Sequence, residues 1–293
     1  LKPHEYTILI KGIEVARDQV QIKSFLAMAP PGVKGEIEGI KTKDPAFGMT
    51  AYWINENQKE KAIMAGYMVV DVPTVVATHL TEIVRAHAYE LLGRQEVQNL
   101  LDNLAQKFPK VVEEVVPKVV TLGDVHKVLQ NLVREQISIR DLLTVIETLG
   151  DHPNVKDPYA LTEGVRQALK RVISKQFATK GVLRVITLEP KLEEYLTATI
   201  QRAEGQSTMS IEPQVAQKLL LVLQKQVEKL MSTEYHPVLL VAPLVRRHLK
   251  NLTEPFMPHL VVLSYGEIEP KVKLENLVTI RMDDLQKTDL RAQ

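Results

Sequence analysis

The chain has 293 residues, enough for about two domains at roughly 150 residues each. With 45% hydrophobic residues it can bury a core, and the absence of cysteine excludes a disulfide scaffold, a thiolate nucleophile and a cysteine-based metal site. The 37 Lys and Arg residues nearly balance the 36 Asp and Glu residues, and a net charge of +1 argues against broad nucleic-acid binding.

The apolar stretches of the sequence are too short to cross a membrane. A spanning helix needs about 20 mostly apolar residues, whereas Val115–Val120 and Val238–Val245 are short and each is interrupted by proline. The first residues, which include Lys2 and Glu5, lack the pattern of a signal peptide. Because the chain starts with Leu1 rather than Met, we expect it to be a piece of a longer protein.

The N-terminal part of the chain is predicted to consist mainly of strands. Alternating apolar residues favour a strand over Glu5–Val15, and Thr42–Gly48 is predicted to be a polar loop. Further strands are expected at Met49–Ile54 and Tyr67–Val72, on either side of a helix at Asn57–Ala65.

Residues 74–177 are predicted to be almost entirely helical. Val76, Leu80 and Val84 recur at helical spacing and indicate the buried face of the first helix. Thr121-x-x-Asp124 and Ser138-x-x-Asp141 resemble capping boxes with Asp in place of Glu. Each precedes an amphipathic stretch, so we expect an antiparallel helix hairpin there. The other helices are expected at Arg94–Phe108 and from Asp157-Pro158 to Gln176.

After Gly181 the pattern changes to strands that alternate with helices, which favours a small α/β layer structure. Strands are expected at Val182–Leu188, Val238–Val241 and Leu260–Leu263, with a further candidate at Leu277–Ile280. The helices are expected at Pro190–Arg202, Pro213–Met231 and Pro243–Leu252.

Catalytic motifs are absent from the sequence. There is no glycine-rich phosphate loop, no H-E-x-x-H and no G-x-S-x-G, so we expect no catalytic residue, cofactor or metal site. Of two histidines on one helix, His79 is expected at the surface and His87 partly buried. Arg246-Arg247-His248 is interpreted as a solvated helix face.

One loop combines polar turn residues with an aromatic side chain: Asp44-Pro45-Ala46-Phe47-Gly48. Asp44-Pro45 is typical of an Asx-type turn. Phe47 can then either fill the core beneath the turn or remain exposed as an anchor for a partner. From the residues alone, we favour the core position.

Several collinear motifs resemble one known family. They include Asp44-Pro-Ala-Phe-Gly48, Ala51-Tyr-Trp-Ile54, Gly66-Tyr-Met-Val-Val-Asp71, Thr74-Val-Val-Ala-Thr-His-Leu80 and Gly93-Arg-Gln-Glu-Val-Gln-Asn-Leu-Leu-Asp102. The same holds for Pro117-Lys-Val-Val-Thr-Leu122, His126-Lys-Val-Leu-Gln-Asn-Leu132 and, more weakly, Pro237-Val-Leu-Leu-Val241. Together they resemble the cytoplasmic domain of the FHIPEP family, the export-gate proteins of flagella and type III secretion, and within it the flagellar members.

The resemblance implies a mixed α/β and α fold of four subdomains. It implies an incomplete first α/β subdomain at 1–22 and 72–91, interrupted by a small α/β subdomain at 23–71. A helical subdomain at 92–171 and a C-terminal α/β subdomain at 172–293 complete the order. Family members usually carry another strand and helix before the equivalent of Leu1, so we expect the first subdomain to lack its N-terminal part.

The resemblance also implies docking rather than catalysis. In flagellar members, export chaperones loaded with late substrates bind a hydrophobic dimple, and the residues that mark it match Asp44, Phe47 and Thr78. Phe47 would then be the apolar anchor, Asp44 would supply a rim charge or fix the turn, and Thr78 would border the site from the helix.

Location and partners follow from the same resemblance. The full protein would be held at the cytoplasmic face of the bacterial inner membrane by N-terminal helices, above a ring of nine copies of this domain. Its partners would be chaperone–substrate complexes, components of the export ATPase complex and other export-gate membrane proteins.

Two other functions compete with the flagellar one. One is the export gate of a virulence type III secretion injectisome. The stretches Val75-Val-Ala-Thr-His-Leu80 and Gly93-Arg-Gln-Glu96 favour the flagellar function over this one. The other is a small-molecule enzyme that uses the C-terminal α/β subdomain.

Overall fold

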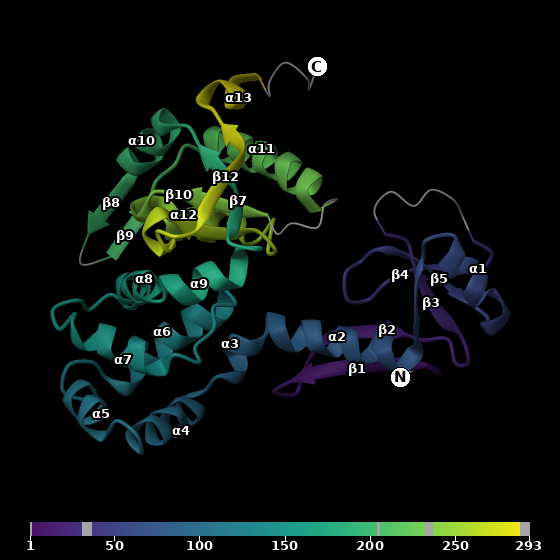
Figure 1. Cartoon of the computed structure of the whole chain (residues 1–293), viewed down its shortest axis with the longest axis horizontal. Helices are drawn as coiled ribbons and strands as arrows, with labels where there is room; N and C mark the ends of the chain where they lie inside the picture. Colours follow the sequence, from purple (N-terminus) through teal and green to yellow (C-terminus); the bar gives the residue numbers. More distant parts are fainter. Residues whose placement is uncertain (1, 31–36, 204–205, 232–236, 288–293) are drawn as a thin grey trace. The chain divides into compact units, whose positions relative to one another are not determined.

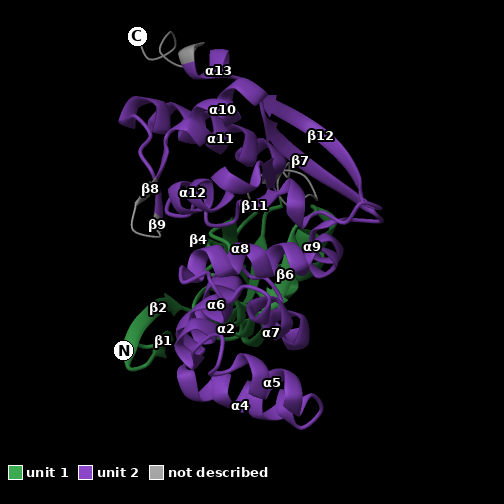
Figure 2. Ribbon diagram, turned by 90° about the vertical axis from the view of Figure 1, so that its left-hand side faces the viewer, with its two compact units in different colours: residues 1–88 green, residues 89–293 purple. Residues whose placement is uncertain are grey.

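The computed structural model describes residues 2–30, 37–203, 206–231 and 237–287 (Figure 1). The chain divides into two compact units, residues 1–88 and residues 89–293 (Figure 2). Both units combine helices with sheets, so the predicted mixed α/β class is confirmed. Among the described residues, we find no helix with the length and apolar character that a membrane span requires.

The first unit begins with a β-hairpin. Strand β1 (Glu5–Ile10) pairs antiparallel with β2 (Ile13–Gln19) through a turn at Lys11 and Gly12. Both turn residues have positive φ, 50° and 82°, as the twist of a two-residue hairpin requires. The predicted single strand over Glu5–Val15 is wrong, because the chain turns at Lys11 and Gly12. Lys-Gly is not one of the common hairpin dipeptides, so the sequence gives no clear turn signal there.

A four-stranded antiparallel sheet follows, in the order β4–β5–β3–β6. Its strands are β3 (Phe25–Met28), β4 (Ile40–Lys43), β5 (Thr50–Ile54) and β6 (Met68–Asp71). The strands predicted at Met49–Ile54 and Tyr67–Val72 are confirmed to within one residue. Between them, the predicted helix is a short 3-10 turn, η1 (Glu56–Gln58), followed by α1 (Lys59–Met64).

The two faces of this sheet carry separate cores. On one face, Ala27, Tyr52 and Ile54 pack against Ala62 of α1. On the other, Leu26, Met28, Ala51 and Trp53 pack against Val75 of the long helix α2 (Val72–Ala86). The side-chain alternation of a strand sends neighbouring residues to opposite faces, so the short strands serve both cores.

Helix α2 is fixed to the rest of the unit by a single line of side chains. Asp71 caps its first turn by accepting a hydrogen bond of 2.9 Å from the backbone N–H of Thr74. Its buried residues are Val75 and His79, one turn apart. The predicted face with Leu80 and Val84 is wrong, because both side chains are exposed. Helix α3 (Ala88–Leu91) follows.

The second unit opens with a helical bundle, as predicted. Its helices are α4 (Arg94–Ala105), α5 (Pro109–Val115), α6 (Leu122–Arg134), α7 (Leu142–Gly150), α8 (Pro158–Ala168) and α9 (Lys170–Phe177). The capping box predicted at Thr121 and Asp124 is confirmed at the start of α6. The one predicted at Ser138 and Asp141 is wrong, because Asp141 is itself the N-cap of α7 and accepts from Thr144.

The C-terminal part is built on a parallel sheet in the order β11–β10–β7–β12. Its strands are β7 (Val182–Leu188), β10 (Val238–Val241), β11 (Val261–Ser264) and β12 (Lys273–Ile280). Around it lie α10 (Pro190–Ala198), the hairpin β8 (Ile200–Ala203)–β9 (Gln206–Met209), α11 (Pro213–Met231), α12 (Pro243–Thr253), η2 (Tyr265–Glu267) and α13 (Met282–Lys287). The predicted α/β layer is confirmed. One difference is that the helix predicted over Pro190–Arg202 ends at Ala198, and the hairpin β8–β9 follows it.

Both faces of the parallel sheet are buried. Leu183, Val185 and Leu240 belong to the core of the helical bundle. Ile186, Leu239 and Val241 face the core formed with α10, α11 and α12. A sheet covered on both faces needs apolar residues at consecutive positions, which explains why these strands were the easiest to predict.

Candidate functional site

The segment from Asp44 to Gly48 forms a closed turn between β4 and β5. The backbone N–H of Phe47 donates to Asp44 Oδ2 at 2.6 Å, and the N–H of Gly48 donates to the carbonyl of Asp44 at 2.8 Å. The N–H of Asp44 donates to the carbonyl of Met49, also at 2.8 Å. Gly48 has a φ of 68°, which favours glycine. Asp44 is only 4% exposed, so its carboxylate holds the turn from within.

Phe47 lies on the outside of that turn. Its side chain is 56% exposed, so the interpretation that it fills the core beneath the turn is wrong. Trp53 and Met49 occupy that core instead. A large apolar side chain this exposed, on a backbone closed by hydrogen bonds, is available to a partner without a prior change of conformation.

Thr78 lies on α2, in the same unit. It is half-buried, and its neighbour His79 is buried at 5% exposure. The prediction of a surface position for His79 is wrong: Nδ1 of the imidazole and the Tyr6 hydroxyl are joined by a hydrogen bond of 2.7 Å. A histidine that faces a tyrosine from a distant strand gives no local signal in the sequence.

Tyr6 connects the hairpin and the helix. Its ring meets that of His79 edge to face, with centroids 5.7 Å apart. Burial, and then the negative charges of Asp18 and Asp44, raise the pKa of Tyr6 to about 12. The phenol therefore stays neutral at physiological pH and forms its hydrogen bond to His79 in that state.

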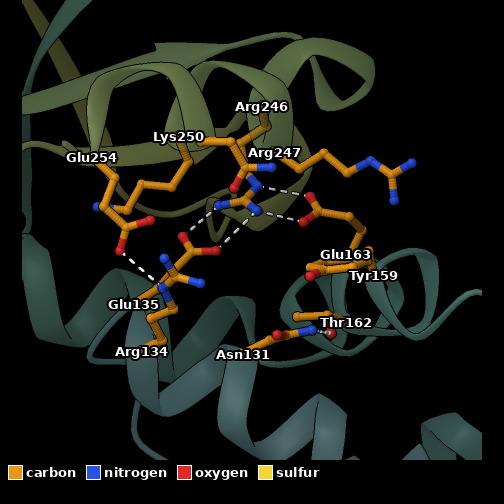
Figure 3. A pocket seen from close by; sticks show the side chains of 11 residues that line it. Asn131, Arg134, Glu135, Tyr159, Thr162, Glu163, Arg246, Arg247, Lys250 and Glu254 are labelled. Carbon is orange, nitrogen blue, oxygen red and sulfur yellow. Dashed lines mark hydrogen bonds and ion pairs between the residues drawn. The ribbon is translucent and has the colours of Figure 1, made fainter. Parts of the chain in front are cut away.

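A buried cluster of charged side chains, which the sequence pattern did not indicate, lies in the other unit. Arg166 of α8 and Arg246 of α12 are 1% and 2% exposed. Arg246 donates to Glu163 and to Glu135 (Figure 3). Arg166 donates to Glu135 and to Glu267. The interpretation of Arg246-Arg247-His248 as a solvated face is wrong, because all three are paired with side chains from distant parts of the chain.

A small cavity lies beside this charged cluster (Figure 3). It encloses about 30 Å³, which is room for about one water molecule. Positive and negative side chains line it together, including Arg134, Lys250 and Glu254. The size and the mixed charge fit a hydrated ion-pair network rather than a ligand site.

Ser207 and His248 form a polar pair on β9 and α12. Ser207 Oγ lies 2.9 Å from His248 Nε2, and Arg247 donates to the same hydroxyl. Burial, helped by the positive charges of Arg247 and Arg246, lowers the pKa of His248. The neutral ring can accept a hydrogen bond from the Ser207 hydroxyl at Nε2. The pair tethers the β8–β9 hairpin to α12, and Arg247 is in turn held by Asp157 at 2.9 Å.

Metal-binding groups are not found in the described part of the chain, where no cluster of three or more His, Asp or Glu side chains could hold an ion.

Comparison with known proteins identifies the family. The sequence pattern of the FHIPEP family matches residues 1–273. The chain belongs to the FHIPEP family. It is 41% identical over 279 residues to the flagellar biosynthesis protein FlhA of Bacillus subtilis, a match that covers 94% of this chain.

Solved structures of type III secretion proteins have the same fold as this FHIPEP chain. The CdsV protein of Chlamydia pneumoniae superposes with a TM-score of 0.84 at 29% identity, covering 96% of this chain and 81% of that one. The cytosolic domain of EscV, solved as a nonamer from a type III secretion system, gives a TM-score of 0.71 at 26% identity, covering 93% and 81%.

The FHIPEP chain spans 41% of the length of its Bacillus subtilis relative. The match to flagellar and secretion proteins places it among protein-transport components of that family.

Proposed function

We propose that this FHIPEP chain is a docking platform of the flagellar type III export gate, and that it binds export chaperone–substrate complexes through Asp44, Phe47 and Thr78. The observation that carries the proposal is the exposure of Phe47 on a turn that the buried Asp44 carboxylate closes. In this account the platform passes its bound cargo to the membrane channel.

The three residues have different roles in the proposed site. Phe47 is the anchor, because burying an exposed aromatic ring in a partner removes a large apolar area from water. Asp44 holds the backbone beneath the ring and contributes geometry rather than a rim charge, since it is buried. Thr78, on α2, would form a second contact of the proposed site beside the Phe47 anchor.

The flagellar role is favoured over a virulence injectisome by sequence similarity. The Bacillus subtilis flagellar relative is 41% identical to the chain, whereas the CdsV and EscV structures are 29% and 26% identical. Because all of them share the fold, the choice between the two systems rests on sequence rather than on architecture.

A non-enzymatic role is supported by the relatives described above, a flagellar biosynthesis protein and two secretion proteins. Several polar groups of the second unit serve structural contacts. Ser207 and His248 tether a hairpin, and the buried carboxylates pair with Arg166 and Arg246.

Assembly and location belong to the same proposal. The nonameric EscV cytosolic domain supports a ring of nine copies. We place the ring at the cytoplasmic face of the inner membrane, where export ATPase components and other gate proteins would contact it. The subdomain boundaries at residues 23, 72, 92 and 172 are part of this proposal.

A pull-down tests the proposed partner class. The immobilised 293-residue chain is incubated with a flagellar export chaperone, with and without its late substrate. The loaded chaperone–substrate complex should be retained. D44A, F47A and T78A variants should each reduce retention. F256A is the matched control, since Phe256 is a 64% exposed phenylalanine of the other unit. Equal retention by all variants would refute the proposed site.

A further inference from the structure

The environment of Thr78 depends on two residues that lie outside the proposed contact surface. Thr78 is half-buried on α2, and the next residue, His79, points into the unit. Successive side chains on a helix are about 100° apart, so the direction in which His79 is held fixes the direction in which Thr78 points. The partner that holds His79 is Tyr6, at 2.7 Å.

The contacts of α2 show why this hydrogen bond matters. Val75 and His79 are the two buried residues of the helix. Val75 packs on the four-stranded sheet with Trp53 and Met28, whereas His79 meets the β1–β2 hairpin. Val72 also packs on this core, so these contacts hold the N-terminal turns of α2. The Tyr6–His79 bond holds the helix one turn further along, directly beside Thr78.

Tyr6 lies on β1 and pairs with Asp18 of β2 across the hairpin. Its hydroxyl therefore ties α2, at the position next to Thr78, to the β1–β2 hairpin.

We infer that the Tyr6–His79 pair, whose imidazole is buried, is a positioning element of the docking site: it holds Thr78 in the orientation that a loaded chaperone recognises. The inference rests on the proposed docking function and extends the site to a third segment, the β1–β2 hairpin. Tyr6 and His79 act through their neighbours and need not touch the partner.

Tyr6→Phe tests the inference, because it removes only the hydroxyl. Calorimetry with a loaded flagellar chaperone should show an affinity loss of about fivefold or more, as coupled neighbours show. The same substitution in a T78A background should cause much less further loss. Tyr52→Phe is the matched control: Tyr52 is a buried tyrosine on the opposite face of the sheet, edge to face with Tyr67. It should bind within twofold of the native chain.

Replacing His79 separates positioning from general stability. Asn places a hydrogen-bonding atom near the position of the imidazole Nδ1, so H79N should keep most of the affinity, whereas H79L should lose it. If either Tyr6→Phe or His79→Leu lowers stability, the Thr78 methyl resonance of the folded chain reports the local change. A native methyl shift together with native affinity in Tyr6→Phe would overturn the inference.

The F47A variant distinguishes this inference from the proposed function. If F47A loses binding while Tyr6→Phe binds like the native chain, the docking site stands and the positioning role is refuted. If F47A binds normally, the docking site itself is refuted and the positioning role falls with it.

Discussion

Arg246 on α12 donates hydrogen bonds to both carboxylate oxygens of Glu135, at 2.6 and 3.1 Å. Glu135 is the C-cap residue of α6. The two residues are 111 positions apart in the sequence. With Glu163, Arg166 and Glu267 they form a buried network that joins the helical bundle to the parallel sheet. This part of the fold is therefore held by charge as well as by its apolar cores.

Arg246→Met should destabilise the second unit strongly. The substitution leaves Glu135 and Glu163 with fewer charge partners in a buried site, and breaking a buried ion pair typically costs about 3–5 kcal/mol. Urea unfolding followed by circular dichroism measures the loss. Arg134→Met is the control, because the Arg134–Glu254 pair is half-exposed and should contribute less than about 1 kcal/mol. Similar losses in both variants would contradict the network's role.

Glu135 should make the stability depend on pH in the acid range. Burial alone would raise its pKa, but the charges of Arg166 and Arg246 outweigh burial and lower the pKa to about 2. A carboxyl group whose pKa is lower in the folded state stabilises the fold above its unfolded pKa, and that stabilisation is lost as the pH falls. The predicted loss is on the order of 3 kcal/mol between about pH 5 and pH 2.

Glu135→Gln identifies this contribution. The difference in unfolding free energy between the native chain and the variant should shrink as the pH falls below about 5, because protonation removes the same charge from the native chain. Urea titrations at successive pH values measure that difference. A difference that stays constant down to pH 3 would show that Glu135 does not carry the predicted charge interaction.

The elements that sequence reasoning found are those with local signals. Val182–Leu188 is rich in apolar and β-branched residues, Pro213–Met231 has proline at its start, and Thr121 with Asp124 forms a cap whose two members are three residues apart. The signal and the structure lie within the same few residues, so a reading of the sequence alone was sufficient.

The errors concern residues whose environment comes from distant parts of the chain. The burial of Arg246 depends on Glu135 and Glu163, and that of His79 depends on Tyr6, 73 positions away. For the site itself, the resemblance directed attention to Phe47, whereas its residue type alone favoured the core. The structure supplied the exposure of Phe47 and the internal role of Asp44.

Asp44 should contribute to binding through its shape rather than its charge. Asp44→Asn keeps an oxygen that can accept from the N–H of Phe47, so the turn and most of the affinity for a loaded chaperone should remain. Asp44→Ala leaves that N–H without its acceptor, and the loss of such a bond typically costs about 1–3 kcal/mol. Calorimetry on both variants measures the affinities. Equal losses would indicate that the charge itself meets the partner.

The central claim is that the exposed ring of Phe47 anchors a loaded export chaperone. Calorimetric titration of the Phe47→Ala chain with a flagellar chaperone–substrate complex tests it most directly, with unfolding curves confirming an intact fold and Phe256→Ala as the control. Phe47→Ala should lose at least about 2 kcal/mol of binding free energy, whereas Phe256→Ala should bind normally. Native affinity in a folded Phe47→Ala chain would contradict it.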